Sequence, residues 1–162
     1  MSIAIVDASP LLFLARLNRL ELLKSSAEKI YIPDAVLEEI NKKQDTATDS
    51  IKEILNTWLF ECTIKNQELR DMLFGLGSGE QDVMIQAYEQ RTSLVILDDQ
   101  DARRTARRLG LKPIGTIGLL LVGKKRGIVD SVENEINRLV EYGFWISDNL
   151  RIEALREAEE MK

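Results

Sequence analysis

Acidic residues follow two apolar runs of the sequence that read as strands. Asp7 ends the run at residues 3–6, and Asp98 and Asp99 follow the run at residues 93–97. Because ligands of an open parallel sheet bind outside the carboxyl ends of its strands, we expect the three carboxylates to converge at that edge. The alternative is that each aspartate caps the helix that follows it.

A second pair of acids, Glu38 and Glu39, lies in the helix expected after Pro33. At about 100° per residue, Glu39 stands roughly 105° from the centre of the apolar stripe of this helix, and Glu38 roughly 155°. We therefore expect Glu39 to border the buried face and look into a cleft, and Glu38 to be solvated. Alternatively, both are ordinary surface acids.

A third pair, Glu80 and Asp82, lies in the first turn of a helix predicted from Ser78, where Ser78 and Gln81 match a capping box. Negative charge there complements the helix dipole, which would explain both acids without a site. The helical wheel places Glu80 on the apolar stripe and Asp82 on its flank. The wheel thus favours Glu80 as the acid that faces the sheet.

Carboxylates that gather in one place require a cation or a proton. Two of them about 4 Å apart repel by roughly 4 kcal/mol at an effective dielectric near 20. Ligands that are all oxygen select Mg²⁺ or Mn²⁺, and such ions can activate water for phosphodiester cleavage. The chain has no histidine, which excludes Ser-His-Asp and Cys-His nucleophile systems, histidine bases and most zinc sites.

The elements that must position these acids alternate between short apolar runs and helical segments. We expect strands at residues 3–6, 29–32, 60–64, 93–97 and 112–114. We expect helices at residues 11–23, 34–43, 51–59, 67–74, 78–90, 101–109, 117–126 and 131–142 and at the C-terminus, with a polar loop at residues 44–50. The order predicts an α/β fold, three-layer α/β/α, with a central parallel sheet of about four to five strands.

The composition fits one domain spanning residues 1–162, with a helical C-terminal extension from about residue 128. A net charge of -5 argues against a broad phosphate-binding surface but leaves room for a local basic patch. No apolar run approaches the roughly 20 residues of a membrane span, no targeting segment is visible, and the single cysteine fits a reducing compartment. We therefore predict a cytoplasmic protein with no membrane partner.

Five segments together resemble PIN domains, and in particular the uncharacterised prokaryotic PIN-like proteins of the DUF3368 type, which are similar to VapC toxins. The matching segments are IVDASPLLFLARL at 5–17, IYIPDAVLEEI at 30–40, GSGEQDVMIQA at 77–87, LVILDDQDARRTARRLG at 94–110 and IGTIGLLLVGKKRG at 114–127. The resemblance implies a PIN fold, dependence on Mg²⁺ or Mn²⁺, single-stranded or structured RNA as substrate, a homodimer and an antitoxin protein as partner. Leu97 and Asp98 stand where toxins usually carry Thr and Asn, which argues against the toxin role rather than the fold.

The resemblance also implies which residues act. It assigns metal-binding and catalytic roles to Asp7, Glu39, Asp82 and Asp99. Further candidates are Glu80 as a metal ligand and Ser9, Asp98 and Asp101 near the ligands. Here the resemblance favours Asp82, whereas the helical wheel favours Glu80.

Basic and aromatic residues complete the candidates. Arg103 and Arg107, with Arg104 and Arg108, form two i, i+4 pairs on the helix after Asp99, where they could meet phosphates; the alternative is a solvated helix face. Trp58 and Trp145 are predicted to be core or dimer residues.

The function predicted from these observations is a metal-dependent endoribonuclease that hydrolyses RNA phosphodiester bonds, with the toxin of a toxin-antitoxin pair as one candidate role. One alternative is a PIN fold that binds nucleic acid or protein without cleaving it. Another is an Mg²⁺-dependent phosphotransfer domain, which the first strand disfavours because a phosphatase of that kind needs a D-x-D motif and this chain has Asp7, Ala8 and Ser9.

Overall fold

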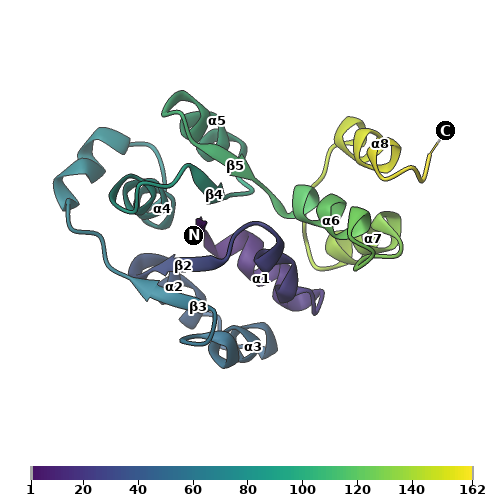
Figure 1. Ribbon diagram of the computed structural model, residues 1–162, viewed down its shortest axis with the longest axis horizontal. Coiled ribbons are helices and arrows are strands. Elements are labelled where there is room, and N and C mark those ends of the chain that lie inside the picture. The colour runs from purple at the N-terminus through teal and green to yellow at the C-terminus, as the bar shows by residue number, and fades with distance from the viewer. Residues whose placement is uncertain (1, 162) are drawn as a thin grey trace.

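The computed structural model describes residues 2–161 and contains one five-stranded sheet in which every strand is parallel to its neighbours. The strands are β1 (Ile3–Val6), β2 (Lys29–Pro33), β3 (Leu59–Cys62), β4 (Leu94–Ile96) and β5 (Lys112–Ile114). Their order across the sheet is β3-β2-β1-β4-β5. In Figure 1 the sheet runs from β3 below to β5 above.

Helices cover both faces of the sheet. They are α1 (Ala8–Arg16), α2 (Asp34–Asn41), α3 (Thr46–Ile54), α4 (Ser78–Glu89), α5 (Gln100–Arg108), α6 (Thr116–Lys125), α7 (Val132–Glu141) and α8 (Asp148–Glu157), with 3₁₀ segments η1 (Leu20–Ser25) and η2 (Gln67–Leu73). Figure 1 shows α4 on one side of the sheet and α1 on the other. This arrangement confirms the predicted three-layer α/β/α fold with a parallel sheet.

The strand order reverses direction at β1. The chain leaves β1 toward β2 and β3 on one side, then returns to β4 and β5 on the other. Val6 pairs with Ile96, and the Asp7 amide donates a hydrogen bond of 3.0 Å to the Ile96 carbonyl. Such a switch point leaves a crevice between the carboxyl ends of the two strands, which is where ligands bind in this class of sheet.

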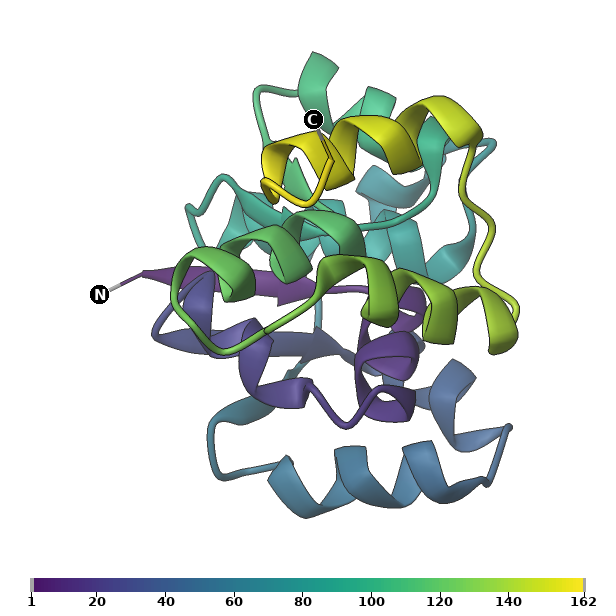
Figure 2. The same cartoon turned by 90° about the vertical axis from the view of Figure 1, so that its right-hand side faces the viewer.

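The last helices lie beside α1, on the side of the molecule that faces the viewer in Figure 2. Helix α6 contacts η1 and α1, and α7 packs against α6. The buried residues of α7 are Val132, Glu135, Ile136 and Leu139. No helix within residues 2–161 combines the length and apolar character needed to cross a membrane.

Three local predictions are wrong. The helix expected at 11–23 is split into α1 and η1, because Asn18 has a positive φ of 59°. The loop expected at 44–50 is mostly helix α3, which Asp45 and Thr48 cap reciprocally. Ser78 is not the cap of α4 but its first residue, and the Gly77 amide donates to Glu80.

Candidate active site

Asp7 stands at the centre of the site, directly after β1. Its side chain is only 6% exposed and makes no hydrogen bond that caps α1, so capping does not explain its position. Burial raises the pKa of Asp7 to about 7, and the nearby carboxylates of Glu80, Glu39 and Asp98 push the pKa in the same direction, while the Ala8 amide opposes them. The structure thus holds a carboxyl group where its charge is costly.

The carboxylate of Asp98, the second residue after β4, is fixed by hydrogen bonds from the protein. Its carboxylate accepts hydrogen bonds from the amide and hydroxyl of Thr116, each 2.7 Å long, and from the Ser9 hydroxyl at 3.4 Å. Burial raises the pKa of Asp98 despite these donors. A Cβ on Gly115 would lie 2.8 Å from Asp98 Oδ1, so the close approach requires glycine here. Ser9 and Thr116 therefore orient Asp98 toward the crevice.

Asp99 is exposed and caps α5, because its carboxylate accepts a 3.0 Å hydrogen bond from the Ala102 amide. The capping alternative is thus correct for Asp99. Its charge nevertheless reaches the site, since the Asp99 carboxylate is among the neighbours that raise the pKa of Glu80.

Glu39 and Glu80 approach Asp7 from α2 and α4. A Cβ on Gly79 would lie 3.3 Å from Asp7 Oδ1 and 3.8 Å from Glu39 Oε2, so the absence of a side chain at Gly79 lets both carboxylates close on the start of α4. Burial raises the pKa of half-buried Glu80, as do Asp99 and Glu39, against the effect of the Gly77 amide. Glu39 itself is exposed at the rim.

Asp82 does not join this group. It is buried and forms a bidentate ion pair with Arg70 on η2, with both N–O distances 2.8 Å. The structure therefore does not place Asp82 where the resemblance predicted a ligand, whereas Glu80 lines the crevice as the helical wheel predicted. Two residues along a helix turn by about 200°, so both acids cannot face the same crevice.

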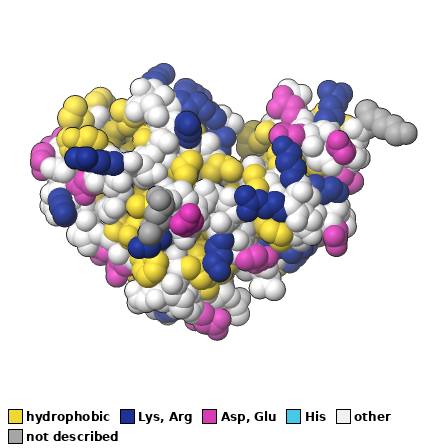
Figure 3. All heavy atoms as spheres, in the orientation of Figure 1, with side chains coloured by type: hydrophobic (Ala, Val, Ile, Leu, Met, Phe, Trp, Pro, Cys, Tyr) yellow, Lys and Arg dark blue, Asp and Glu magenta, His cyan; other side chains and the backbone are white. Residues whose placement is uncertain are grey.

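The basic residues of α5 divide into two groups. Arg103 is half-buried and donates a 3.1 Å hydrogen bond to the Leu97 carbonyl, beside Asp98. Arg107 is exposed, and Asp101 is exposed and paired with Arg104 at 3.4 Å. The Asp101 carboxylate is nevertheless among the charges that raise the pKa of Glu80. Figure 3 shows basic side chains gathered over α5. Arg103 thus supports the loop after β4, and Arg107 remains available to a ligand.

The crevice has a volume of about 310 Å³. It is lined by Asp7, Ser9, Phe13, Glu80, Asp98, Asp99, Gly143, Phe144 and Trp145. Sequence reasoning missed its aromatic wall, which comes from residues distant in the chain. It also missed Thr116, although Thr116 lies within the IGTIG stretch that carries part of the resemblance.

A larger groove of about 1090 Å³ lies elsewhere, between η2, α4 and residues 109–111. Its one carboxylate, Glu89, accepts hydrogen bonds from the amides of Lys65 and Asn66. Because that carboxylate serves the local backbone, the smaller crevice is the better candidate for chemistry.

The donor set of the crevice fits a hard divalent cation by its chemistry, since it offers only oxygen and its carboxylates raise one another's pKa. Within residues 2–161 no three of these acids lie close enough to form a ready-made metal cage. An ion would therefore have to draw carboxylates such as Glu39 and Glu80 toward Asp7.

Comparison with known proteins agrees with this architecture. The family model described as DUF3368: PIN domain matches residues 3–160. The structure of the PIN domain endonuclease Utp24 superposes with a TM-score of 0.54 at 13% sequence identity, covering 70% of this chain and 84% of that one. A PilT N-terminus domain protein, SSO1118 from Sulfolobus solfataricus P2, gives a TM-score of 0.51 at 16% identity over 90% of this chain and 99% of the other. No curated protein is similar enough to count as a match. Because the family model spans nearly all of the sequence, the chain belongs to the PIN-domain family.

Proposed function

We propose that this protein is a divalent-metal-dependent nuclease that hydrolyses phosphodiester bonds of RNA. The observation that carries the proposal is the position of Asp7, which is buried without a capping bond at the point where the strand order reverses. The charges of Glu80, Glu39 and Asp98 reach it there and raise its pKa. The similarity to a protein described as a PIN domain endonuclease supports the same chemistry.

The residues of the site would have different roles, according to where they lie. Asp7, Glu39, Glu80 and Asp99 would hold Mg²⁺ or Mn²⁺, which supplies the activated water and neutralises charge on the phosphate. Asp98 faces the same crevice and is oriented by Thr116 and Ser9. Arg107 offers an exposed guanidinium to the RNA backbone near the site.

The test is cleavage of a mixed pool of labelled RNAs with Mg²⁺ or Mn²⁺, with EDTA and Asp7→Asn as controls. We expect metal-dependent products and a loss of at least about 100-fold in rate for Asp7→Asn, because even residues that only support metal ligands are worth about 10- to 100-fold. Glu39→Gln is compared with Glu38→Gln, since both residues are exposed on α2 but only Glu39 approaches Asp7.

A second function, binding of nucleic acid without cleavage, is favoured by two observations. The acids among the described residues do not form a ready-made group of three for a metal, and Asp98 and Asp99 already accept hydrogen bonds from the protein. If folded protein binds RNA but produces no metal-dependent products, this second function replaces the first. The homodimer and the antitoxin implied by the resemblance stay predictions.

A further inference from the structure

Trp145 is a large aromatic side chain that is exposed to solvent. It is 78% exposed and lies in the segment that joins α7 to α8. It lines the crevice that also contains Asp7 and Asp98. Of the two roles predicted for Trp145, the core position is therefore wrong, and the dimer contact stays a prediction. A ring this exposed beside a charged crevice is available to a ligand.

The two residues before Trp145 are fixed by backbone and ring contacts. Gly143 adopts a φ of 97°, which ends α7 in a left-handed turn, and the Phe144 amide donates a 2.9 Å hydrogen bond to the Leu139 carbonyl. The Phe144 ring packs edge-on against Phe13 of α1, with centroids 5.1 Å apart. Trp145 thus projects from an anchored loop, so little order has to be gained when a ligand binds.

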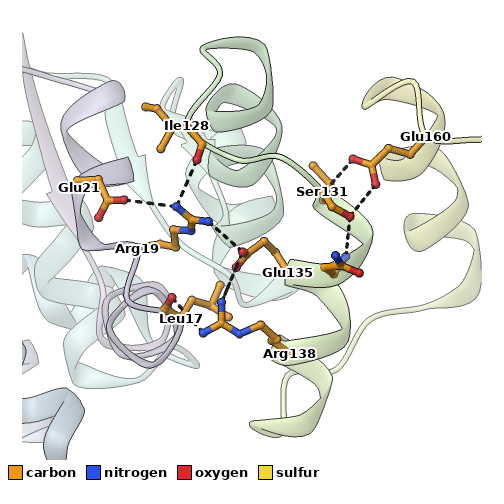
Figure 4. Close-up of polar contacts among 10 residues, drawn as sticks. Leu17, Arg19, Glu21, Ile128, Ser131, Glu135, Arg138 and Glu160 are labelled. Carbon is orange, nitrogen blue, oxygen red and sulfur yellow. Dashed lines mark hydrogen bonds and ion pairs between the residues drawn. The ribbon is translucent and has the colours of Figure 1, made fainter.

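Helix α7, which carries this loop, is itself fastened to the start of the chain. Figure 4 shows Glu135 between two arginines: Arg19 pairs with it at 3.2 Å and Arg138 at 3.3 Å. Arg19 also donates to the Ile128 carbonyl, and Arg138 to the Leu17 carbonyl. Because both arginines join α7 to the residues after α1, the C-terminal helices hold a constant position relative to Asp7.

Glu160, which follows α8, also binds α7 and α6. The carboxylate of Glu160 accepts hydrogen bonds from the Val132 and Glu133 amides at the start of α7. Figure 4 shows Glu160 beside Ser131, whose hydroxyl also donates to it. Lys124 of α6 pairs with Glu160 at 3.2 Å. The residues after α8 are therefore anchored to the start of α7 and to α6.

We propose that Trp145 stacks on an unpaired base of the nucleic acid whose phosphate lies at the carboxylates, and so adds to the affinity for a single strand. This inference rests on the proposed function for the phosphate. A single strand presents phosphates and base faces side by side, which matches a crevice with acids on one wall and an aromatic ring on another. A duplex keeps its base faces stacked and cannot offer one to Trp145.

The test follows binding by the fluorescence of Trp145 itself. In full-length protein carrying Trp58→Phe, Trp145 is the remaining tryptophan. A single-stranded RNA oligonucleotide is titrated in the presence of Ca²⁺, which oxygen ligands accept, and the same sequence is titrated as a duplex. We expect the single strand to quench the fluorescence and the duplex to leave it nearly unchanged.

Variants then measure what the ring contributes. Trp145→Ala should weaken binding of the single strand by about 5- to 150-fold, the range measured for loss of one stacked base, while Trp145→Phe retains most of the affinity. Tyr142→Ala is the matched control, because Tyr142 is also exposed near the same turn but does not line the crevice. In cleavage assays, Trp145→Ala should raise KM far more than it lowers kcat.

The outcomes separate this inference from the nuclease proposal. Stacking without cleavage overturns only the nuclease, and cleavage with equal affinity of Trp145→Ala and unsubstituted protein overturns only the stacking. Emission from Trp145 that is already blue-shifted without RNA and changes with protein concentration would show that a second copy covers the ring, and would also overturn the inference.

Discussion

Replacing Asp7 by asparagine is expected to stabilise the metal-free protein at neutral and alkaline pH. The pKa of Asp7 rises from 3.8 to about 7 in the folded chain, mainly through burial. A shift of about 3 units at about 1.4 kcal/mol per unit means that ionised Asp7 costs the fold up to about 4 kcal/mol. Asparagine has the same shape without the charge, so Asp7→Asn removes this cost.

The sign and the pH window follow from the same shift. Below about pH 4, Asp7 is protonated in both the folded and the unfolded chain, and its full contribution to stability is present. Between about pH 4 and pH 7 the unfolded chain loses this proton first, so the free energy of unfolding falls as pH rises. The advantage of Asp7→Asn should therefore be small at pH 4 and largest above pH 7.

The assay is urea unfolding in EDTA at pH 4, 6 and 8, with Asp71→Asn as a control at an exposed aspartate. Adding Mn²⁺ should then stabilise the unsubstituted protein, by about 2.7 kcal/mol at a concentration of 100 Kd, and leave Asp7→Asn unchanged. The reasoning is refuted if Asp7→Asn is no more stable than the unsubstituted protein at pH 8 in EDTA.

Three further predictions concern the surroundings of the site. Arg70→Ala should destabilise the fold by about 3 kcal/mol in urea unfolding, because it leaves the buried Asp82 carboxylate without its partner, and an unchanged midpoint would contradict this. Thr116→Val should lower the metal-dependent cleavage rate by about 10- to 100-fold by removing a hydrogen bond to Asp98, and a normal rate would show that this orientation is unimportant. Gly115→Ala should reduce cleavage too, since its Cβ would lie 2.8 Å from Asp98 Oδ1; a crystal structure of the variant with Asp98 unmoved would contradict that cause.

The sheet could be predicted from the sequence because its strands are short apolar runs bounded by polar residues. Each of the five expected strands is present, with ends that differ by a few residues. The errors arose where one local interaction overrides the pattern. Asp45 and Thr48 start α3 with a reciprocal cap that uses threonine in place of the more familiar glutamate, so the segment resembled a loop.

The positions of the acids could be predicted where they depend only on the backbone, that is, on where a strand ends or on which face of a helix a residue lies. Asp7 and Asp98 follow neighbouring strands, and the wheel placed Glu80 toward the crevice. The position of Asp82 outside the crevice could not be predicted, because its ion pair with Arg70 is a tertiary contact that a resemblance carried over by position does not include. Trp145 was out of reach for the same reason, since only the packing of α7 against the start of the chain brings it there.

Asp99 shows that helix capping and metal binding need not exclude each other. One carboxylate oxygen accepts the Ala102 amide, and a carboxylate has two oxygens with about four lone pairs, so capacity remains for an ion. Serine caps helices about as well as aspartate but brings no charge. Asp99→Ser should therefore keep the urea midpoint while weakening binding of Mn²⁺, whereas Asp99→Ala should lose about 1 kcal/mol of stability as well. Equal Mn²⁺ affinity in Asp99→Ser and the unsubstituted protein would restrict Asp99 to its cap and leave Asp7, Glu39 and Glu80 as the metal-binding acids.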